Sequence, residues 1–195
     1  MSKAVTVTDA SFEADVELNG AVFQYTVGAD GTLTPKSPPQ VSVSGHPGSV
    51  AVSPDGHSVY VTNEVVTTNN DTFQFTNNVL QFTVGADGTL TPTPGGVATG
   101  NGASGIAITG DGESAYVANP GSNTISQYSV GTGGALSPRS PATVPTGSDP
   151  SQIAITPTRR VPTSKAQCKN DGWQQFGFKN QGQCIAFVEH GPPTP

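Results

Sequence analysis

The sequence predicts an all-β fold built from repeated antiparallel sheets, and three observations support this prediction. Whole phrases recur: FQYTVGADGTLTP at residues 23–35 returns as LQFTVGADGTLTP at residues 80–92 and as ISQYSVGTGGALSP at residues 125–138. Only 11% of the residues are charged, against roughly 25% in an average domain, so helix-forming Lys and Glu are scarce. Asp-Gly pairs stand where tight hairpins need a positive φ. Such recurrence indicates stacked supersecondary units.

Each repeat contains four short β-branched and aromatic runs separated by turn signals. In the first complete repeat we expect strands at residues 48–53, 57–62, 78–84 and 89–98. In the second we expect them at 104–109, 114–118, 123–130 and 135–144. Partial repeats flank these two, with strands expected at 4–8, 21–27, 32–44 and 151–156. Four antiparallel strands that recur at this spacing are typical of the blades of a β-propeller.

A family resemblance adds to this pattern. The stretch SVAVSPDGHSVYVTNE resembles the YVTN repeat of lactonase-like seven-bladed β-propellers, and GTLTP followed by VSGHPGSVAVSPDG resembles that family's linker between blades. The resemblance covers residues 4–157 and implies an incomplete β-propeller of about three four-stranded blades. It also implies relatives of the 6-phosphogluconolactonase type, which use His, Arg and acidic side chains at the central channel.

Three blades are fewer than a ring needs. Propellers typically have about four to eight blades, because each blade covers the faces of its neighbours and ring closure protects the end blades. We therefore expect that the chain is a fragment of a longer protein with further blades, or that it closes its ring by self-association.

The repeat stops near residue 157, and the remaining chain has a different composition. We expect a partial propeller over 1–157, a linker over 158–166, a cysteine-containing module over 167–190 and a proline-rich tail over 191–195. The module holds both cysteines, Cys168 and Cys184, near the single tryptophan and several phenylalanines. Two isolated cysteines supply too few ligands for zinc, so we predict a disulfide. The segment resembles a short C-terminal tail of secreted bacterial proteins.

Acidic residues gather in loops on one side of the predicted meander. Because each strand reverses direction, the loops between second and third strands lie on the same side as the loops that join the repeats. Ligands usually bind propellers on that side. The acids expected there are Glu13, Asp15, Glu17, Glu64, Asp71 and Asp149. Either they solvate long loops, or they form an anionic face for a basic partner or a metal ion, for which calcium best suits oxygen ligands.

His46, in the linker SGHPG, is the histidine expected on that side. It has two interpretations: a loop residue that shapes the blade junction, or a general base oriented by Glu64 or Asp149. None of the three arginines is expected where it would clamp a phosphate or carboxylate. No G-x-S-x-G nucleophile elbow occurs in the sequence.

Two functions from different classes follow. The main prediction is a binding or scaffold module for a protein or small-molecule ligand, and the alternative is a hydrolase that opens a lactone ring. The net charge of −6 provides no basic field for nucleic acid. No apolar run after Met1 has the length of a membrane span or a signal peptide. The cysteine tail nevertheless predicts an extracellular or cell-envelope protein.

Overall fold

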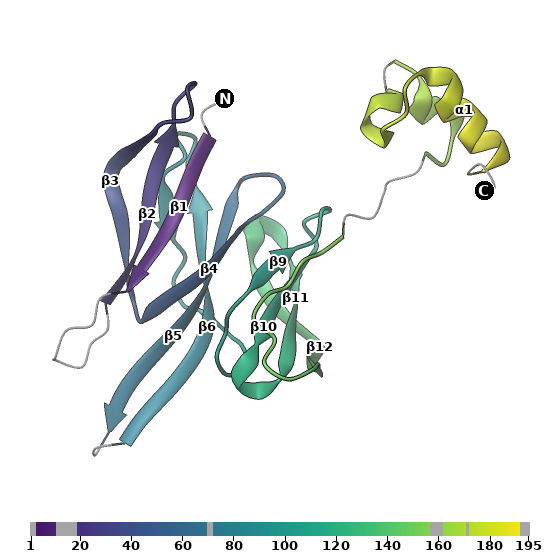
Figure 1. The fold of residues 1–195 in the computed structure, drawn as a ribbon. Coiled ribbons are helices and arrows are strands. Elements are labelled where there is room, and N and C mark those ends of the chain that lie inside the picture. The colour runs from purple at the N-terminus through teal and green to yellow at the C-terminus, as the bar shows by residue number, and fades with distance from the viewer. Residues whose placement is uncertain (1–2, 11–18, 70–71, 157–161, 171, 192–195) are drawn as a thin grey trace. The chain divides into compact units, whose positions relative to one another are not determined.

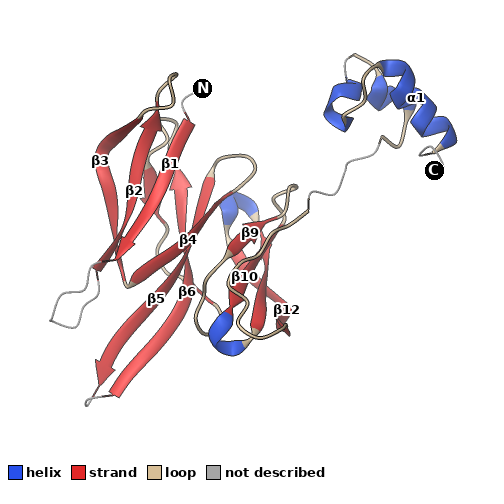
Figure 2. Ribbon diagram, viewed as in Figure 1, coloured by secondary structure: helices blue, strands red, loops and turns tan. Residues whose placement is uncertain are grey.

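The structure is a computed structural model that describes residues 3–10, 19–69, 72–156, 162–170 and 172–191. The chain divides into two compact units, Met1–Ile155 and Thr156–Pro195. The regular secondary structure described in the first unit consists of strands and short 3₁₀ turns, whereas that of the second unit is helical (Figures 1 and 2).

The described residues of unit one form three antiparallel sheets, which confirms the all-β, propeller-type prediction (Figure 1). Sheet one has the order β1-β2-β3, from β1 (Lys3–Ala10), β2 (Asn19–Val27) and β3 (Leu33–Ser44). Sheet two runs through β4 (His46–Val52), β5 (Ser58–Asn69), β6 (Thr72–Val84) and β7 (Leu90–Pro92), and β8 (Val97–Ala98) also pairs with β6. Sheet three consists of β9 (Ile106–Ile108), β10 (Ser114–Asn119), β11 (Thr124–Val130) and β12 (Leu136–Pro145). The 3₁₀ turns are η1 (Pro120–Ser122) and η2 (Thr132–Gly134).

The long loop expected between residues 62 and 78 is instead a hairpin. β5 and β6 remain paired in register from Ser58 opposite Thr83 to Asn69 opposite Thr72. The β-branched run VVTT, which is opposite FQFT in the register, favours this extended pairing. Glu64 therefore lies on a strand, which corrects its expected place in a loop.

Two other expected strands differ in the structure. The strand expected over 89–98 is divided into β7 and β8, because Pro94 has no N–H for the ladder and Gly95 turns the chain with φ 79°. Residues 151–156 form no strand, although their sequence SQIAIT repeats those of β4 and β9. An inner strand of this kind needs a second strand to pair with, and the described residues offer none there.

Neighbouring sheets bury their faces against each other. Alternate residues of β5 point to opposite sides, so Val59 and Val61 pack toward sheet one and Tyr60 toward sheet three. The buried cluster between sheets one and two is Val22, Val59, Val61, Phe82 and Leu90. The buried cluster between sheets two and three is Tyr60, Val79, Ile106, Ala115, Val117, Tyr128 and Leu136. The core of unit one thus lies between blades.

A glutamine and a leucine form the same hydrogen bond across both junctions. Gln24 of β2, which is 2% exposed, accepts from the backbone N–H of Leu90 at 2.6 Å through Oε1. Gln81 of β6 accepts from the N–H of Leu136 at 2.8 Å in the same way. Both leucine side chains are buried. We call this contact the Gln–Leu junction bond.

Unit two folds around the predicted disulfide between Cys168 and Cys184, which the structure confirms. Both cysteines and Phe176 are buried, with Trp173 and Phe178 packed against them. The elements are η3 (Lys165–Cys168), η4 (Gly172–Phe176) and α1 (Gln181–His190). The helix was not predicted from the sequence. No helix among the described residues is long and apolar enough to span a membrane.

Local capping explains where the unit-two helices begin. The side chain of Asn180 accepts from the N–H of Gln183 at 2.9 Å at the start of α1. Ser164 forms a capping box with Gln167 at the start of η3, inside the stretch predicted as a linker. Of the predicted tail, residues 192–195 lie outside the described residues.

We expect Gln24→Ala to lower the free energy of unfolding of unit one by about 1–3 kcal/mol, because it leaves the buried N–H of Leu90 without an acceptor. Urea unfolding followed by far-UV circular dichroism measures this loss. The matched control is Gln74→Ala, at an exposed position on β6. Equal stability of the two variants would contradict the role assigned to the junction bond.

We expect reduction of the disulfide to destabilise unit two by about 3 kcal/mol. The bond joins residues separated by 16 positions, and closing such a loop restricts the unfolded chain. Trp173 is the single tryptophan, so its fluorescence during urea unfolding reports unit two alone. The Cys168→Ser/Cys184→Ser variant should unfold at the urea midpoint of the reduced protein, whether or not reductant is present. Two free thiols by mass spectrometry in oxidised material would refute the pairing.

Candidate functional site

Of the acids expected on the ligand face, the structure describes two, Glu64 and Asp149. Glu13, Asp15, Glu17 and Asp71 lie outside the described residues. Asp149 is exposed in the loop after β12, where its backbone N–H donates to Asn123 Oδ1 at 2.8 Å. Glu64 lies on β5, next to His46.

His46, Glu64 and Asn77 form a row across three strands. His46 of β4 is directly opposite Glu64 of β5, and Glu64 is directly opposite Asn77 of β6. Residues directly opposite in an antiparallel pair share one face, with their Cβ atoms about 4.5–5.5 Å apart. His46 and Glu64 are half-buried, and Asn77 is 6% exposed. The sequence predicted Glu64 or Asp149 beside His46, and the register places Glu64 opposite it.

Gly45 allows the backbone before β4 to approach β5 closely. Gly45 has φ 100°, and a Cβ atom there would lie 2.5 Å from the carbonyl oxygen of Glu64. Any other residue would collide with the β5 backbone or adopt a strained conformation. Gly45 thus allows His46 to stand opposite Glu64.

Asn77 has a fixed orientation and an unused donor. Its Oδ1 accepts from the backbone N–H groups of Gly102 and Ala103, both at 3.1 Å. Its buried Nδ2 has no hydrogen-bond partner among the described residues. Buried polar groups are almost always paired, so such a donor indicates a place for a ligand acceptor. The sequence analysis did not identify Asn77.

A second buried amide, Asn63, stands beside the row. Its Nδ2 donates to Ser44 O at 3.1 Å and to Asn78 Oδ1 at 3.3 Å, whereas its Oδ1 has no partner among the described residues. The equivalent residue of sheet three, Asn119, is fully bonded, because the hydroxyl of Thr99 donates to its Oδ1 at 2.6 Å. Sheet two therefore leaves amide atoms available where sheet three does not. The sequence signal for Asn63 was its place as the last residue of the YVTN motif.

An apolar strip continues the row along the hairpin. Asn77, Phe75 and Phe73 follow at intervals of two along β6, so their side chains share one face. Phe75 and Phe73 are 59% and 64% exposed. The outer half of the hairpin pairs only with itself, and Figure 1 shows it continuing beyond β4. A ligand at the row would meet polar groups on one side and aromatic rings on the other.

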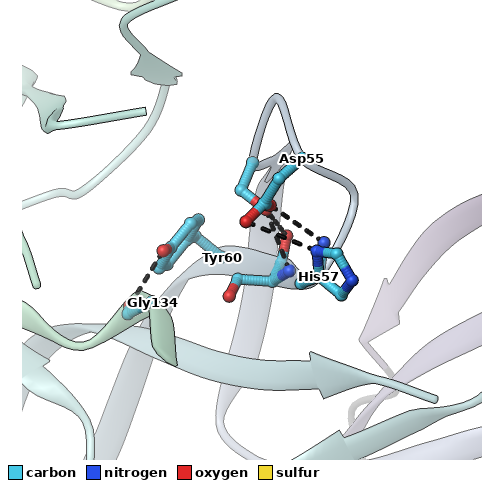
Figure 3. A network of polar contacts seen from close by, with 6 residues as sticks. Asp55, His57, Tyr60 and Gly134 are labelled. Atoms are coloured by element: carbon cyan, nitrogen blue, oxygen red, sulfur yellow. Dashed lines mark hydrogen bonds and ion pairs between the residues drawn. The ribbon is translucent and has the colours of Figure 1, made fainter. Parts of the chain in front are cut away.

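The opposite end of unit one has a pocket of about 490 Å³ between the turns of sheets two and three. Asp55 lies in its wall, where it accepts from Ser53 Oγ at 2.5 Å and from the N–H of His57 at 3.0 Å, with His57 Nδ1 3.4 Å away (Figure 3). The hydroxyl of Tyr60 donates to Gly134 O at 2.8 Å.

These groups build a turn and do not form a nucleophilic triad. In a triad the serine hydroxyl bonds one nitrogen of the histidine ring, and the carboxylate bonds the other nitrogen. Here the carboxylate of Asp55 lies between Ser53 and His57 and bonds both. The Ser53 hydroxyl, helped by the His57 N–H, lowers the pKa of Asp55 below its usual 3.8. The His46 row is therefore the stronger candidate site.

Among the described residues, no three His, Cys, Asp or Glu side chains gather closely enough to hold a metal ion. The calcium prediction drew partly on Glu13, Asp15, Glu17 and Asp71, which lie outside those residues. It stays a prediction.

Comparison with known proteins identifies one family. The family described as "Lactonase, 7-bladed beta-propeller" matches residues 19–169. The periplasmic gluconolactonase of Pseudomonas aeruginosa has a similar structure, with 20% identity and a TM-score of 0.51 over 71% of this chain and 44% of that one. Hydrazine synthase of Kuenenia stuttgartiensis matches with 18% identity and a TM-score of 0.47 over 75% and 48%. No curated protein matches. This chain spans about half the length of these two structures.

We expect Ser53→Ala to raise the pKa of Asp55 toward 3.8, because the largest cause of its lowering is the Ser53 hydrogen bond. Since the folded-state pKa lies below the unfolded one, the stabilisation by Asp55 is present above the usual pKa and is lost as the pH falls through the folded value. Carboxyl ¹³C chemical shifts during an acid titration measure the pKa of Asp55 in the variant and in the unmodified protein. Asp87, whose partner is Thr89, is the internal control and should not shift.

Proposed function

This chain belongs to the lactonase family of seven-bladed β-propellers, and from that premise we propose that it binds a lactone at the His46–Glu64–Asn77 row and hydrolyses the ring. The row carries the proposal, because it places a base, a carboxylate and an unpaired buried donor side by side. General-base hydrolysis of an ester can use all three: the base activates water, the carboxylate orients the base and the donor stabilises the oxyanion.

In the proposed reaction the imidazole of His46 takes a proton from water as the water oxygen attacks the lactone carbonyl carbon. Glu64 orients the imidazole and stabilises the imidazolium ion. The Nδ2 of Asn77 donates to the carbonyl oxygen as it becomes an oxyanion. The ring C–O bond then breaks, and the leaving oxygen takes the proton from His46. The product is an open-chain hydroxy acid.

The charges of unit one favour a lactone without a phosphate group. The Lys36 ammonium donates to Asp87 O at 2.5 Å, and the Arg139 guanidinium donates to Tyr128 O and Ser114 Oγ. The Lys36 and Arg139 cations are thus engaged away from the row. A phosphate would meet the carboxylate of Glu64 with no described cation to bind it. The exposed rings of Phe75 and Phe73 suit the apolar face of a neutral ring.

Binding without turnover is the second candidate, as expected for a binding or scaffold module. Phe73 and Phe75 favour it, because they offer a large apolar contact surface and no reactive group. In either function we place the protein outside the cytoplasm. The disulfide of unit two suits an oxidising compartment, and a structural relative is a periplasmic gluconolactonase.

We expect slow but measurable hydrolysis of a neutral sugar lactone and little of its phosphorylated analogue. His46→Ala should lower kcat about 10²–10⁴-fold, the usual contribution of a general base. His57→Ala, a histidine at the opposite end of unit one, is the matched control and should retain full activity. A pH-stat assay measures both, and chelation with EDTA should leave the rate unchanged.

The outcomes separate the two candidate functions. Saturable binding of the lactone by calorimetry without turnover would replace hydrolysis with binding. Equal rates in His46→Ala and the unmodified protein would remove the proposed base. Asn77→Asp tests the donor, because it replaces the Nδ2 amide with a carboxylate that repels the oxyanion.

A further inference from the structure

The outer part of the β5–β6 hairpin has an aromatic face and a polar face. Side chains alternate along β6, so Phe73 and Phe75 lie on one face and Gln74 and Thr76 lie on the other. All four side chains are exposed, so contact with water does not explain why the two rings share one face. Exposed apolar groups that gather on one surface indicate a binding site.

The aromatic face is also the face of the His46–Glu64–Asn77 row. Phe75 and Phe73 follow Asn77 at intervals of two on β6, and Val66 of β5 is directly opposite Phe75. Val66 is half-buried. We call Val66, Phe73 and Phe75 the hairpin patch. Sheet two packs against sheet one and against sheet three, so the patch is exposed because β5 and β6 are long, at 12 and 13 residues.

The buried end of this face needs a hydrogen-bond acceptor. Asn77 is 6% exposed, and its Nδ2 has no partner among the described residues. A neutral carbonyl oxygen suits this donor better than a carboxylate does, because Glu64 lies directly opposite Asn77 and would repel a second negative charge. The ligand that fits the whole face therefore has a neutral carbonyl group at one end and an apolar group at the other.

We propose that the substrate is a lactone that carries an alkyl chain, with its ring at the row and its chain along the hairpin patch; this proposal rests on the proposed function. A strand rises about 3.4 Å per residue, so Phe73 lies about 14 Å along β6 from Asn77. A carbon–carbon bond is about 1.5 Å long, so a chain on the order of ten carbons reaches that far. Phe73 and Phe75 then determine specificity. A sugar lactone has no such chain and cannot reach Phe73.

Hydrolysis of two lactones that differ only in chain length tests the substrate class. We expect kcat/KM to be about 10–100-fold higher for γ-dodecalactone than for γ-hexalactone, because each half-covered methylene gains about twofold. The difference should lie mainly in KM, since the chain contacts the protein away from the reacting carbonyl. Phe73→Ala/Phe75→Ala should bring the two kcat/KM values to within about threefold of each other. Gln74→Ala/Thr76→Ala, on the polar face, is the matched control and should keep the preference.

Binding measured without turnover separates the substrate class from the hydrolysis itself. His46→Ala removes the proposed base, so calorimetry can measure the affinity of this variant for both lactones. It should bind γ-dodecalactone at least about tenfold more tightly than γ-hexalactone, and adding Phe73→Ala/Phe75→Ala should remove that difference.

The outcomes for the two proposals differ. The expected binding preference, with no turnover by the unmodified protein, would keep the alkyl-chain lactone as the ligand and refute the hydrolysis. Equal kcat/KM and equal affinity for the two lactones would keep the hydrolysis and overturn the alkyl-chain substrate. A preference for γ-dodecalactone that persists in Phe73→Ala/Phe75→Ala would overturn the role of the hairpin patch, and an absence of both binding and turnover would overturn both proposals.

Discussion

Sheets one and two each bind one backbone N–H and one leucine of the sheet that follows, and the arrangement of unit one depends on that contact. A sheet of three or four short strands cannot bury both of its faces alone. Gln24 and Gln81 reach across the junctions to the N–H groups of Leu90 and Leu136, and the leucine side chains fill the space beside them. The tyrosines add a polar contact at the second junction, where Tyr60 donates to Gly134 O and Tyr128 to Ala98 O.

The candidate site follows from the way sheet two departs from this repeat. Its hairpin is 12 and 13 residues long in β5 and β6, against 6 and 7 in β10 and β11. The extra length carries Phe73 and Phe75 beyond the reach of sheet three and leaves them exposed. At the base of this extension the oxygen of the buried Asn77 amide accepts from two N–H groups of the loop before β9, and its N–H₂ has no partner among the described residues. The same junction that supports the fold therefore fixes the orientation of the Asn77 amide, opposite Glu64 in the register.

Unit two reaches a stable core by a different route. Its described residues bury few large side chains, so the disulfide between Cys168 and Cys184 stands at the centre of the packing. The rings of Phe178 and Phe187 meet at a centroid distance of 5.4 Å, and Lys165 pairs with Glu189 across the surface. The Lys165 ammonium also lowers the pKa of Glu189. A short module with so small an apolar core depends on its covalent link.

The sequence by itself determined the repeat, the strand order within each sheet and the pairing of the two cysteines, because turn residues, alternating side chains and a single pair of thiols are local properties. It also predicted Glu64 or Asp149 as the neighbour of His46, and the register of β4 on β5 selects Glu64. Only the tertiary structure decided that Glu64 lies on a strand and that Asn77 completes the row, because register across β4, β5 and β6 brings together residues distant in the chain. It likewise decided which backbone groups the glutamines bind. Gln24 and Gln81 occupy the same place in the repeat, and each meets its partner, the N–H of Leu90 or of Leu136, only because neighbouring sheets pack against each other.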